Sequence, residues 1–349
     1  MFSNAGIGEY FLKENGIDIL VANELLLERS KVYSHLHPNA TMVQGDITDQ
    51  AVFDRYIEKC RKVRPQLFIA TPPCQSFSTA NTKRQGAADP RDFLINKALE
   101  AVQLLIPDYV LIENVAPFLK ATIDGAKTMP QHIADSQPEY SFSFTKLDAA
   151  DYGTAQHRKR AIILGWRKGL TPWGLPQVQP KICLDAAIGH LASLESGQTD
   201  TSTPWHFAAE HNRRQVLWLK NTPTGLSAFK NTVHYPQKDG RKIKAFDNSY
   251  KRMEWHKPAY TITTNSGSIS TQNSVHPGRK LSDGTYSDAR TLTIAEILLC
   301  NGLPLTFSVP HGTGNKTVRH ILGECISPKF LLALCRECPL AFQQLRAAA

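Results

Sequence analysis

The chain has 349 residues, of which 42% are hydrophobic, so it can bury sizeable cores, and its length suggests two domains. Seven cysteines at uneven spacing, with no charged and then apolar signal peptide at the start, predict a reducing, cytoplasmic setting. No apolar run approaches the roughly 18 residues that a membrane-spanning helix requires, so the sequence predicts a protein that is not embedded in a membrane.

The formal net charge of +9 is concentrated in the middle of the chain. Residues 1–166 hold 18 Lys and Arg against 19 Asp and Glu, whereas residues 167–260 hold 14 against 7. Aromatic residues such as Trp218, Tyr235 and Trp255 are interleaved with these cations. This combination suggests a nucleic-acid partner, and a solvated basic face is the alternative.

The first segment combines a glycine-containing turn with a strand that ends in an acid. Residues 2–8 are mostly small, and such residues at a strand-to-helix turn leave main-chain amides free to bind a carboxylate or phosphate. An ordinary glycine-rich turn is the alternative. Residues 16–24 then suit a strand with Glu24 at its tip, where a carboxylate can accept hydrogen bonds from both ribose hydroxyls. A helix N-cap role for Glu24 is the other interpretation.

The stretch at 67–78 holds Cys74, around which the other predicted elements are expected to be arranged. Four apolar residues, 67–70, predict a buried strand that breaks at Pro72 and Pro73 and then presents Cys74. Ligands in open α/β sheets collect beyond the carboxyl ends of the strands, which is where Cys74 is expected. A lone cysteine is more often a small buried hydrophobe than a nucleophile, so this position alone decides nothing.

Later segments supply further polar groups. Residues 79–92 are polar and suit either a loop that closes over ligand or an idle surface loop. A strand over 109–115 carries Glu113 near its tip. The polar residues Gln156, Arg158 and Arg160 alternate with their neighbours and lead into an apolar strand. Because successive side chains in a strand point to opposite faces, these three are expected on one face. After Trp166 prolines cluster and regular alternation of strands and helices stops until about residue 290, which predicts a domain boundary.

A series of blocks, in order along the chain, resembles those of the DNA (cytosine-5-)-methyltransferases. Pro-Pro-Cys-Gln-x-Phe-Ser at 72–78 resembles the nucleophile loop of that family. The other blocks are the Phe-containing glycine turn at the start, Glu-Asn-Val at 113–115, Gln-x-Arg-x-Arg at 156–160, and the terminal pair at 290–296 and 323–328. The departures from the family pattern are Asn4 for a glycine, Ala155 for a proline, Ala295 for an arginine and Glu324 for an asparagine.

The family also has an apolar strand immediately before the phenylalanine that corresponds to Phe2. This sequence begins at Met1, so the first strand is expected either to lie upstream of Met1 or to be lost. A form extended by several apolar residues is expected to be the more stable one.

The resemblance implies an α/β fold of the S-adenosylmethionine-dependent methyltransferase type. Its doubly wound sheet is expected to be mostly parallel, with a second, smaller and irregular target-recognition domain. The predicted boundaries are 1–166 for the cofactor-binding and catalytic domain, 167–289 for target recognition, and 290–349 for C-terminal helices that return to the catalytic domain.

The activity implied is transfer of a methyl group from S-adenosyl-L-methionine to carbon 5 of a flipped-out cytosine in a specific double-stranded DNA sequence. Cys74 would add to carbon 6, a protonated Glu113 would neutralise ring nitrogen 3, and Arg158 would stabilise the thiolate and the intermediate. Gln75 and Arg160 complete the predicted catalytic set. The enzyme would act as a monomer in a restriction-modification system, with a cognate endonuclease that cuts the same site.

The remaining predicted contacts form two sets. The cofactor set is Phe2, Ala5, Gly6, Glu24, Asp46, Ile47 and Pro72. The DNA set is Ser78, Lys83, Arg84, Gln156, Lys242, Lys244, Tyr260, Thr261, Thr263 and Ser266. Cys335 and Cys338 lack a second pair at zinc spacing, so no metal site is predicted. A family member that acts on RNA and a catalytically silent DNA-binding relative are the alternative functions.

Overall fold

The computed structural model describes residues 1–73, 94–123, 126–243 and 246–340. Six of the predicted site residues lie outside these ranges: Cys74, Gln75, Ser78, Lys83, Arg84 and Lys244. Within the described ranges no helix is long and apolar enough to cross a membrane.

The chain divides into two compact units. Unit 1 comprises residues 1–149, 159–178 and 330–349, and unit 2 comprises residues 150–158 and 179–329. The helices that follow residue 290 therefore belong to unit 2 up to residue 329, and the chain joins unit 1 again only from residue 330. The assignment of target recognition to 167–289 stays a prediction.

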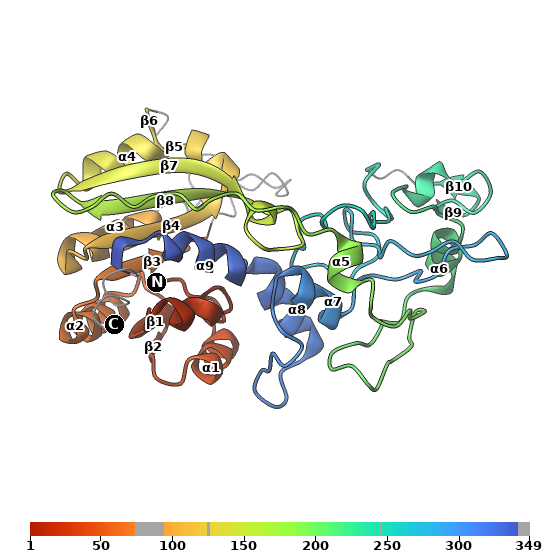
Figure 1. Cartoon of the computed structure of the whole chain (residues 1–349), viewed down its shortest axis with the longest axis horizontal. Helices are drawn as coiled ribbons and strands as arrows, with labels where there is room; N and C mark the ends of the chain where they lie inside the picture. Colours follow the sequence, from red (N-terminus) through yellow and green to blue (C-terminus); the bar gives the residue numbers. More distant parts are fainter. Residues whose placement is uncertain (74–93, 124–125, 244–245, 341–349) are drawn as a thin grey trace. The chain divides into compact units, whose positions relative to one another are not determined.

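In the described residues unit 1 contains two main sheets and one short two-stranded ladder (Figure 1). The smaller sheet pairs β1 (Val21–Glu24) in parallel with β2 (Thr41–Gln44). The larger sheet has the order β3-β4-β8-β7, with β3 (Leu67–Ala70), β4 (Tyr109–Val115), β7 (Tyr140–Asp148) and β8 (Lys159–Arg167). A small ladder joins β5 (Thr122–Ile123) to β6 (Lys127–Thr128).

The larger sheet is mixed in the described residues. β3 and β4 are parallel, but β8 is antiparallel to both β4 and β7. Only residues 149–158 connect β7 to β8. A parallel crossover needs a dozen or more residues, usually a helix, so this short connection favours an antiparallel pair.

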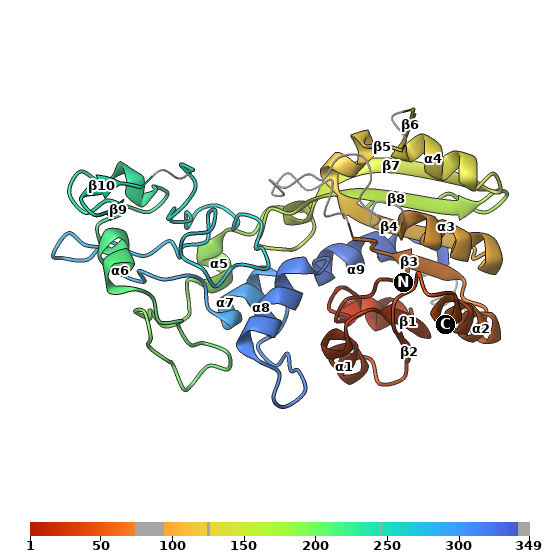
Figure 2. The same ribbon diagram turned by 180° about the vertical axis from the view of Figure 1, so that it is seen from behind.

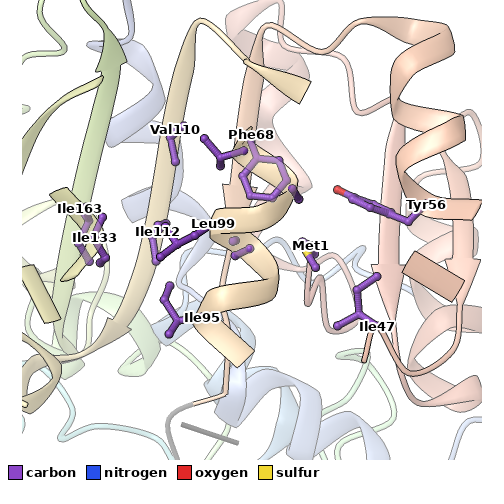
Figure 3. Packing of buried hydrophobic residues seen from close by; sticks show 14 of the residues in the cluster. Met1, Ile47, Tyr56, Phe68, Ile95, Leu99, Val110, Ile112, Ile133 and Ile163 are labelled. Atoms are coloured by element: carbon purple, nitrogen blue, oxygen red, sulfur yellow. The ribbon is translucent and has the colours of Figure 1, made fainter. Parts of the chain in front are cut away.

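Helices and 3₁₀ turns flank these strands, and several bury one face in a common core. They are η1 (Gly8–Asn15), α1 (Leu27–Leu36), α2 (Gln50–Val63), α3 (Leu94–Leu105), η4 (Ala116–Lys120), α4 (Met129–Ser136), η5 (Ala149–Asp151) and α9 (Pro328–Arg336). In α2 the buried residues Val52, Phe53, Tyr56, Ile57 and Cys60 follow the helical period. Figure 3 shows how Tyr56 joins Met1, Phe68 and the α3 side chains in this core.

Unit 2 has little regular structure. Its elements are α5 (Leu184–Ile188), α6 (Arg213–Lys220), η6 (Ala228–Lys230), β9 (Gln237–Lys238), β10 (Arg241–Lys242), α7 (Ile294–Cys300) and α8 (Asn315–Glu324). A small apolar cluster packs the rings of Trp218 and Phe229 edge-on against Tyr250, at centroid distances of 5.6 and 5.9 Å. Two buried guanidinium groups donate hydrogen bonds to main-chain carbonyls that lie outside the named strands. Arg252 donates to His276 O and Leu219 O, and Arg290 donates to Leu194 O.

The stability of unit 1 is expected to depend on pH through the buried carboxyl group of Glu9. Burial raises the pKa of the Glu9 carboxyl to about 7. The folded chain therefore binds more protons than the unfolded chain between about pH 4.5 and pH 7, so this group lowers stability as the pH rises through that window. Glu9→Gln is expected to stabilise the protein by on the order of 1–2 kcal/mol at pH 8 and to have little effect at pH 4.

Urea unfolding of native and variant protein at both pH values measures this difference. Glu14→Gln is the matched control because Glu14 is exposed on the same 3₁₀ turn. A Glu9→Gln effect that is the same at pH 4 and pH 8 would contradict the assignment.

Candidate active site

Two predicted cofactor residues meet at the carboxyl edge of the β1-β2 sheet. Because β1 and β2 are parallel and Glu24 is opposite Gln44, the carboxylates of Glu24 and Asp46 come to the same edge. Glu24 accepts a hydrogen bond from the Leu26 amide at 3.0 Å, and Asp46 accepts from the amide and hydroxyl of Thr48 at 2.9 and 2.8 Å. Both carboxylates are therefore held in place by their own turns.

The turn before η1 explains one departure from the family pattern. Asn4 has a φ of 49°, in the left-handed region that asparagine enters more readily than most residues, and its Oδ1 accepts from the Ala5 amide at 2.7 Å. Gly6 has a φ of 73°, and a Cβ there would lie 2.6 Å from His37 and 2.8 Å from Tyr33. Asn4 can therefore replace a glycine, whereas Gly6 cannot be replaced without strain.

Asn23 is a residue that the sequence did not single out. Its side-chain amide donates to Val43 O at 3.0 Å and Gly45 O at 3.2 Å. Its main-chain carbonyl accepts from the Ser3 amide at 2.8 Å. It thus ties the first turn to the edge that carries Glu24 and Asp46. Its place directly before the acid at a strand tip was the only available signal.

Glu113 and Arg160 form an ion pair at the end of β4. β8 is antiparallel to β4 and places Arg160 opposite Val115, two residues beyond Glu113. Arg160 Nε lies 2.8 Å from Glu113 Oε1, and both side chains are largely buried. The neighbouring Asn114 donates to Pro72 O at 3.3 Å, so the β4 tip contacts the start of the loop after β3. The predicted residues Pro72, Glu113 and Arg160 are brought together here.

Gln156 and Arg158 lie in unit 2, before β8 begins. Arg158 donates to the carbonyls of Ile262, Gly323 and Glu324 at 3.3, 3.1 and 2.9 Å. Gln156 is 1% exposed; its Nε2 donates to Asn301 Oδ1 at 2.6 Å and its Oε1 accepts from the Ile262 amide at 3.2 Å. Both side chains therefore fix main chain within unit 2, and their predicted catalytic and DNA-binding roles stay predictions.

The predicted DNA-contacting segment 260–266 is anchored by this same framework. Thr261 and Thr263 are exposed, whereas Ile262 between them is buried. Thr261 Oγ1 donates to His157 O at 2.7 Å, and Lys251 Nζ lies 3.2 Å from the Tyr260 hydroxyl. Ser266 is buried.

Two further residues outside the predicted site sets support this segment, Gly323 directly and Asn301 through its bond with Gln156. A Cβ on Gly323 of α8 would lie 2.4 Å from the main chain of Thr263 and Thr264, so only glycine allows this close approach. Asn301 Oδ1 also lies within 3.4 Å of the Ser327 hydroxyl. Of the other predicted DNA contacts, Lys242 is exposed and donates to Phe229 O at 2.9 Å.

Four of the six described cysteines are poorly suited to nucleophilic attack. Burial raises the pKa of Cys60, Cys300 and Cys335, and raises the pKa of Cys338 to about 12. Such thiols hold their protons at neutral pH. Among the described residues no group of three or more His, Cys, Asp or Glu could hold a metal ion.

The class of protein follows from comparison of this chain with known proteins. Residues 1–339 match the family model of the C-5 cytosine-specific DNA methylases. The chain therefore belongs to the C-5 cytosine-specific DNA methylase family, and it is a DNA (cytosine-5-)-methyltransferase.

One relative agrees with that assignment, and two solved structures share the fold. The chain is 45% identical to the Type II methyltransferase M1.HgaI of Avibacterium volantium over 97% of this chain and 96% of the relative. Among solved structures, it is similar to a prophage-encoded E. coli protein described as a DNA modification methyltransferase, with a TM-score of 0.71, 15% identity and 98% of each chain covered. It is also similar to a Spodoptera frugiperda DNMT2 mutant, with a TM-score of 0.63, 16% identity, and 96% and 97% of the two chains covered.

Proposed function

We propose that this enzyme methylates carbon 5 of a flipped-out cytosine in one double-stranded DNA sequence, through a covalent Cys74 adduct, and so protects host DNA in a restriction-modification system. The Glu113–Arg160 pair beside Pro72 carries this proposal, because it sets a carboxyl group and a cation next to the loop that leads to Cys74. The similarity to a Type II methyltransferase over nearly the whole chain supports the restriction-modification role.

The residues at the β1-β2 edge fit S-adenosyl-L-methionine. Glu24 offers a carboxylate for the ribose hydroxyls and Asp46 offers an acceptor for the adenine amine, while Ile47 directly after Asp46 belongs to the buried core of unit 1. Ala5 and Gly6 lie on the turn tied to this edge through Ser3 and Asn23. When bound, the cofactor supplies the methyl group.

The protein groups act on the cytosine ring. The Cys74 thiolate adds to carbon 6, which makes carbon 5 nucleophilic. In its protonated form Glu113 neutralises the negative charge that develops at ring nitrogen 3, and it accepts a hydrogen bond from the exocyclic amine. Arg160 fixes the orientation of this carboxyl group, and a water molecule finally removes the carbon-5 proton so that the thiolate can leave. A paired base hides these atoms, so the cytosine must leave the helix at a cost of a few kcal/mol.

Arg160→Ala is expected to lower kcat by about 10²-fold, because Glu113 loses the group that holds it in position while charge develops on the ring. DNA affinity should change little. Single-turnover methylation together with a DNA-binding titration separates the two effects.

Arg167→Ala is the matched control, since Arg167 lies at the other end of β8 in an exposed pair with Asp108 at 2.7 Å. Equal losses in the two variants would contradict the role of Arg160.

The overall function is tested by incubating purified protein with plasmid DNA and S-adenosylmethionine, followed by bisulfite sequencing. We expect 5-methylcytosine at one short sequence and resistance of that site to a restriction endonuclease that cuts it. An RNA of the same sequence should stay unmodified. Methylation of the RNA alone, or methylation of DNA without regard to sequence, would overturn the proposal.

A further inference from the structure

The strands β9 and β10 of unit 2 form a hairpin with a short turn. Lys238 at the end of β9 pairs with Arg241 at the start of β10, so the turn consists of Asp239 and Gly240 alone. Their φ values of 51° and 72° are both positive, as in a type I′ turn, and Asp-Gly is a preferred sequence for that turn. Figures 1 and 2 show the hairpin next to α6, at the end of unit 2 away from α7 and α8. The conformation of the turn is therefore fixed by its own two residues.

One face of this hairpin is attached to unit 2 through Lys242. The Lys242 Nζ donates to Phe229 O at 2.9 Å and lies 5.6 Å from the centroid of the Tyr235 ring. The Ile243 amide donates to Pro236 O at 3.1 Å, which continues the pairing beyond the two strands. The ammonium group of Lys242 is therefore already engaged inside unit 2.

The other face of the hairpin carries two cations. Opposite residues of an antiparallel pair share a face, whereas neighbours along a strand point to different faces. Lys238 and Arg241 therefore share the face that points away from the contacts of Lys242, and both are exposed. In the described ranges neither has an acidic partner, whereas Lys230 lies 4.0 Å from Asp247. We call the face that bears Lys238 and Arg241 the outer face.

The charge of the outer face favours an anionic partner. Two like charges directly opposite each other destabilise a strand pair, and an anion placed over both of them removes that repulsion. The short turn and the contacts of Lys242 hold the hairpin in one conformation, so less conformational entropy is lost on binding. The chain belongs to a family of DNA methylases, so the polyanion that this enzyme meets is DNA.

We propose that the outer face of the hairpin binds the phosphate backbone of duplex DNA, with Lys238 and Arg241 each contacting one phosphate. Lys242, one of the predicted DNA contacts, is instead a positioning residue that holds the hairpin against unit 2. Phosphate contacts carry no sequence information, so this face contributes equally to the binding of any duplex. The inference rests on the proposed action on double-stranded DNA and adds the element that holds its backbone.

The test measures binding of the 349-residue protein to two duplexes of unrelated sequence, by fluorescence anisotropy at about 50 to 200 mM salt. Lys238→Ala and Arg241→Ala should each reduce the slope of log Kobs against log salt by about 0.9, and the double variant by about 1.8. Affinity should fall by the same factor for both duplexes. Lys242→Met is the matched control, because it removes the same charge from the other face of the hairpin and should leave the slope unchanged.

Unchanged slopes in Lys238→Ala and Arg241→Ala would overturn the proposal and leave a solvated basic face. An equal change of slope in Lys242→Met would overturn the assignment of the two faces. A loss confined to one of the duplexes would assign the hairpin to base readout and not to the backbone. Bisulfite sequencing of DNA treated with the native enzyme tests the proposed function separately: if that DNA is methylated while the slopes stay unchanged, only this inference fails.

Discussion

Cys74→Ser is expected to lower the rate of methyl transfer by at least about 10³-fold while DNA and cofactor affinities stay within about tenfold. The reason is the attacking atom: a serine hydroxyl is almost wholly protonated at neutral pH and is a far weaker nucleophile than a thiolate. DNA with 5-fluorocytosine at the target should trap the native enzyme as a covalent complex, because the fluorine cannot leave as the carbon-5 proton does. The variant should form no such complex.

Cys183→Ser is the matched control. Cys183 is the one described cysteine that is only partly buried, so it tests whether loss of an accessible thiol by itself impairs the enzyme. Full activity and full trapping are expected for this variant. A covalent complex with Cys74→Ser, or its absence with Cys183→Ser, would remove Cys74 from the mechanism.

Arg290→Met is expected to destabilise unit 2 by about 3–5 kcal/mol. Arg290 is 0% exposed and lies 2.7 Å from Asp288 and 2.8 Å from Glu296, both of which are buried. Burial alone would raise the pKa of Glu296, but the charge of Arg290 holds that pKa well below its usual range. Removing the guanidinium leaves two carboxylates in a site that can no longer solvate them. Urea unfolding followed by tryptophan fluorescence measures the loss.

Two further variants make this prediction specific. Lys257→Met removes an exposed pair with Glu254 at 2.9 Å in the same unit and should have far less effect on stability than Arg290→Met. Glu296→Gln combined with Arg290→Met should lose less than the sum of the single changes, since glutamine removes one unpaired charge and still accepts from the Thr293 amide at the start of α7. Strict additivity would show that Arg290 and Glu296 are not coupled.

The stability of unit 2 at low pH depends on the same cluster of Arg290, Asp288 and Glu296. The pKa of Glu296 and the pKa of Asp288 are both lowered in the folded state, where the nearby cations outweigh burial. Their contribution to stability is therefore present above their ordinary pKa values and is lost as the pH falls below them. This direction is opposite to that of Glu9, whose raised pKa lowers stability as the pH rises.

Much of this protein could be predicted from local sequence. The apolar run 109–115 is a buried strand, and Thr293 with Glu296 forms the capping box that a Thr three residues before a Glu favours. The order of the motifs gave the family, and a match over residues 1–339 confirms it. These features depend on neighbouring residues or on order along the chain, which the sequence contains directly.

The tertiary structure decided where the polar side chains go. Alternation placed Gln156, Arg158 and Arg160 on one face, yet Arg158 binds carbonyls 165 and 166 residues away while Arg160 pairs with Glu113 on a neighbouring strand. Strand periodicity fixes the side on which a residue lies, but not which distant segment covers that side. The mixed larger sheet has the same origin, because strand order depends on pairings between segments far apart in sequence.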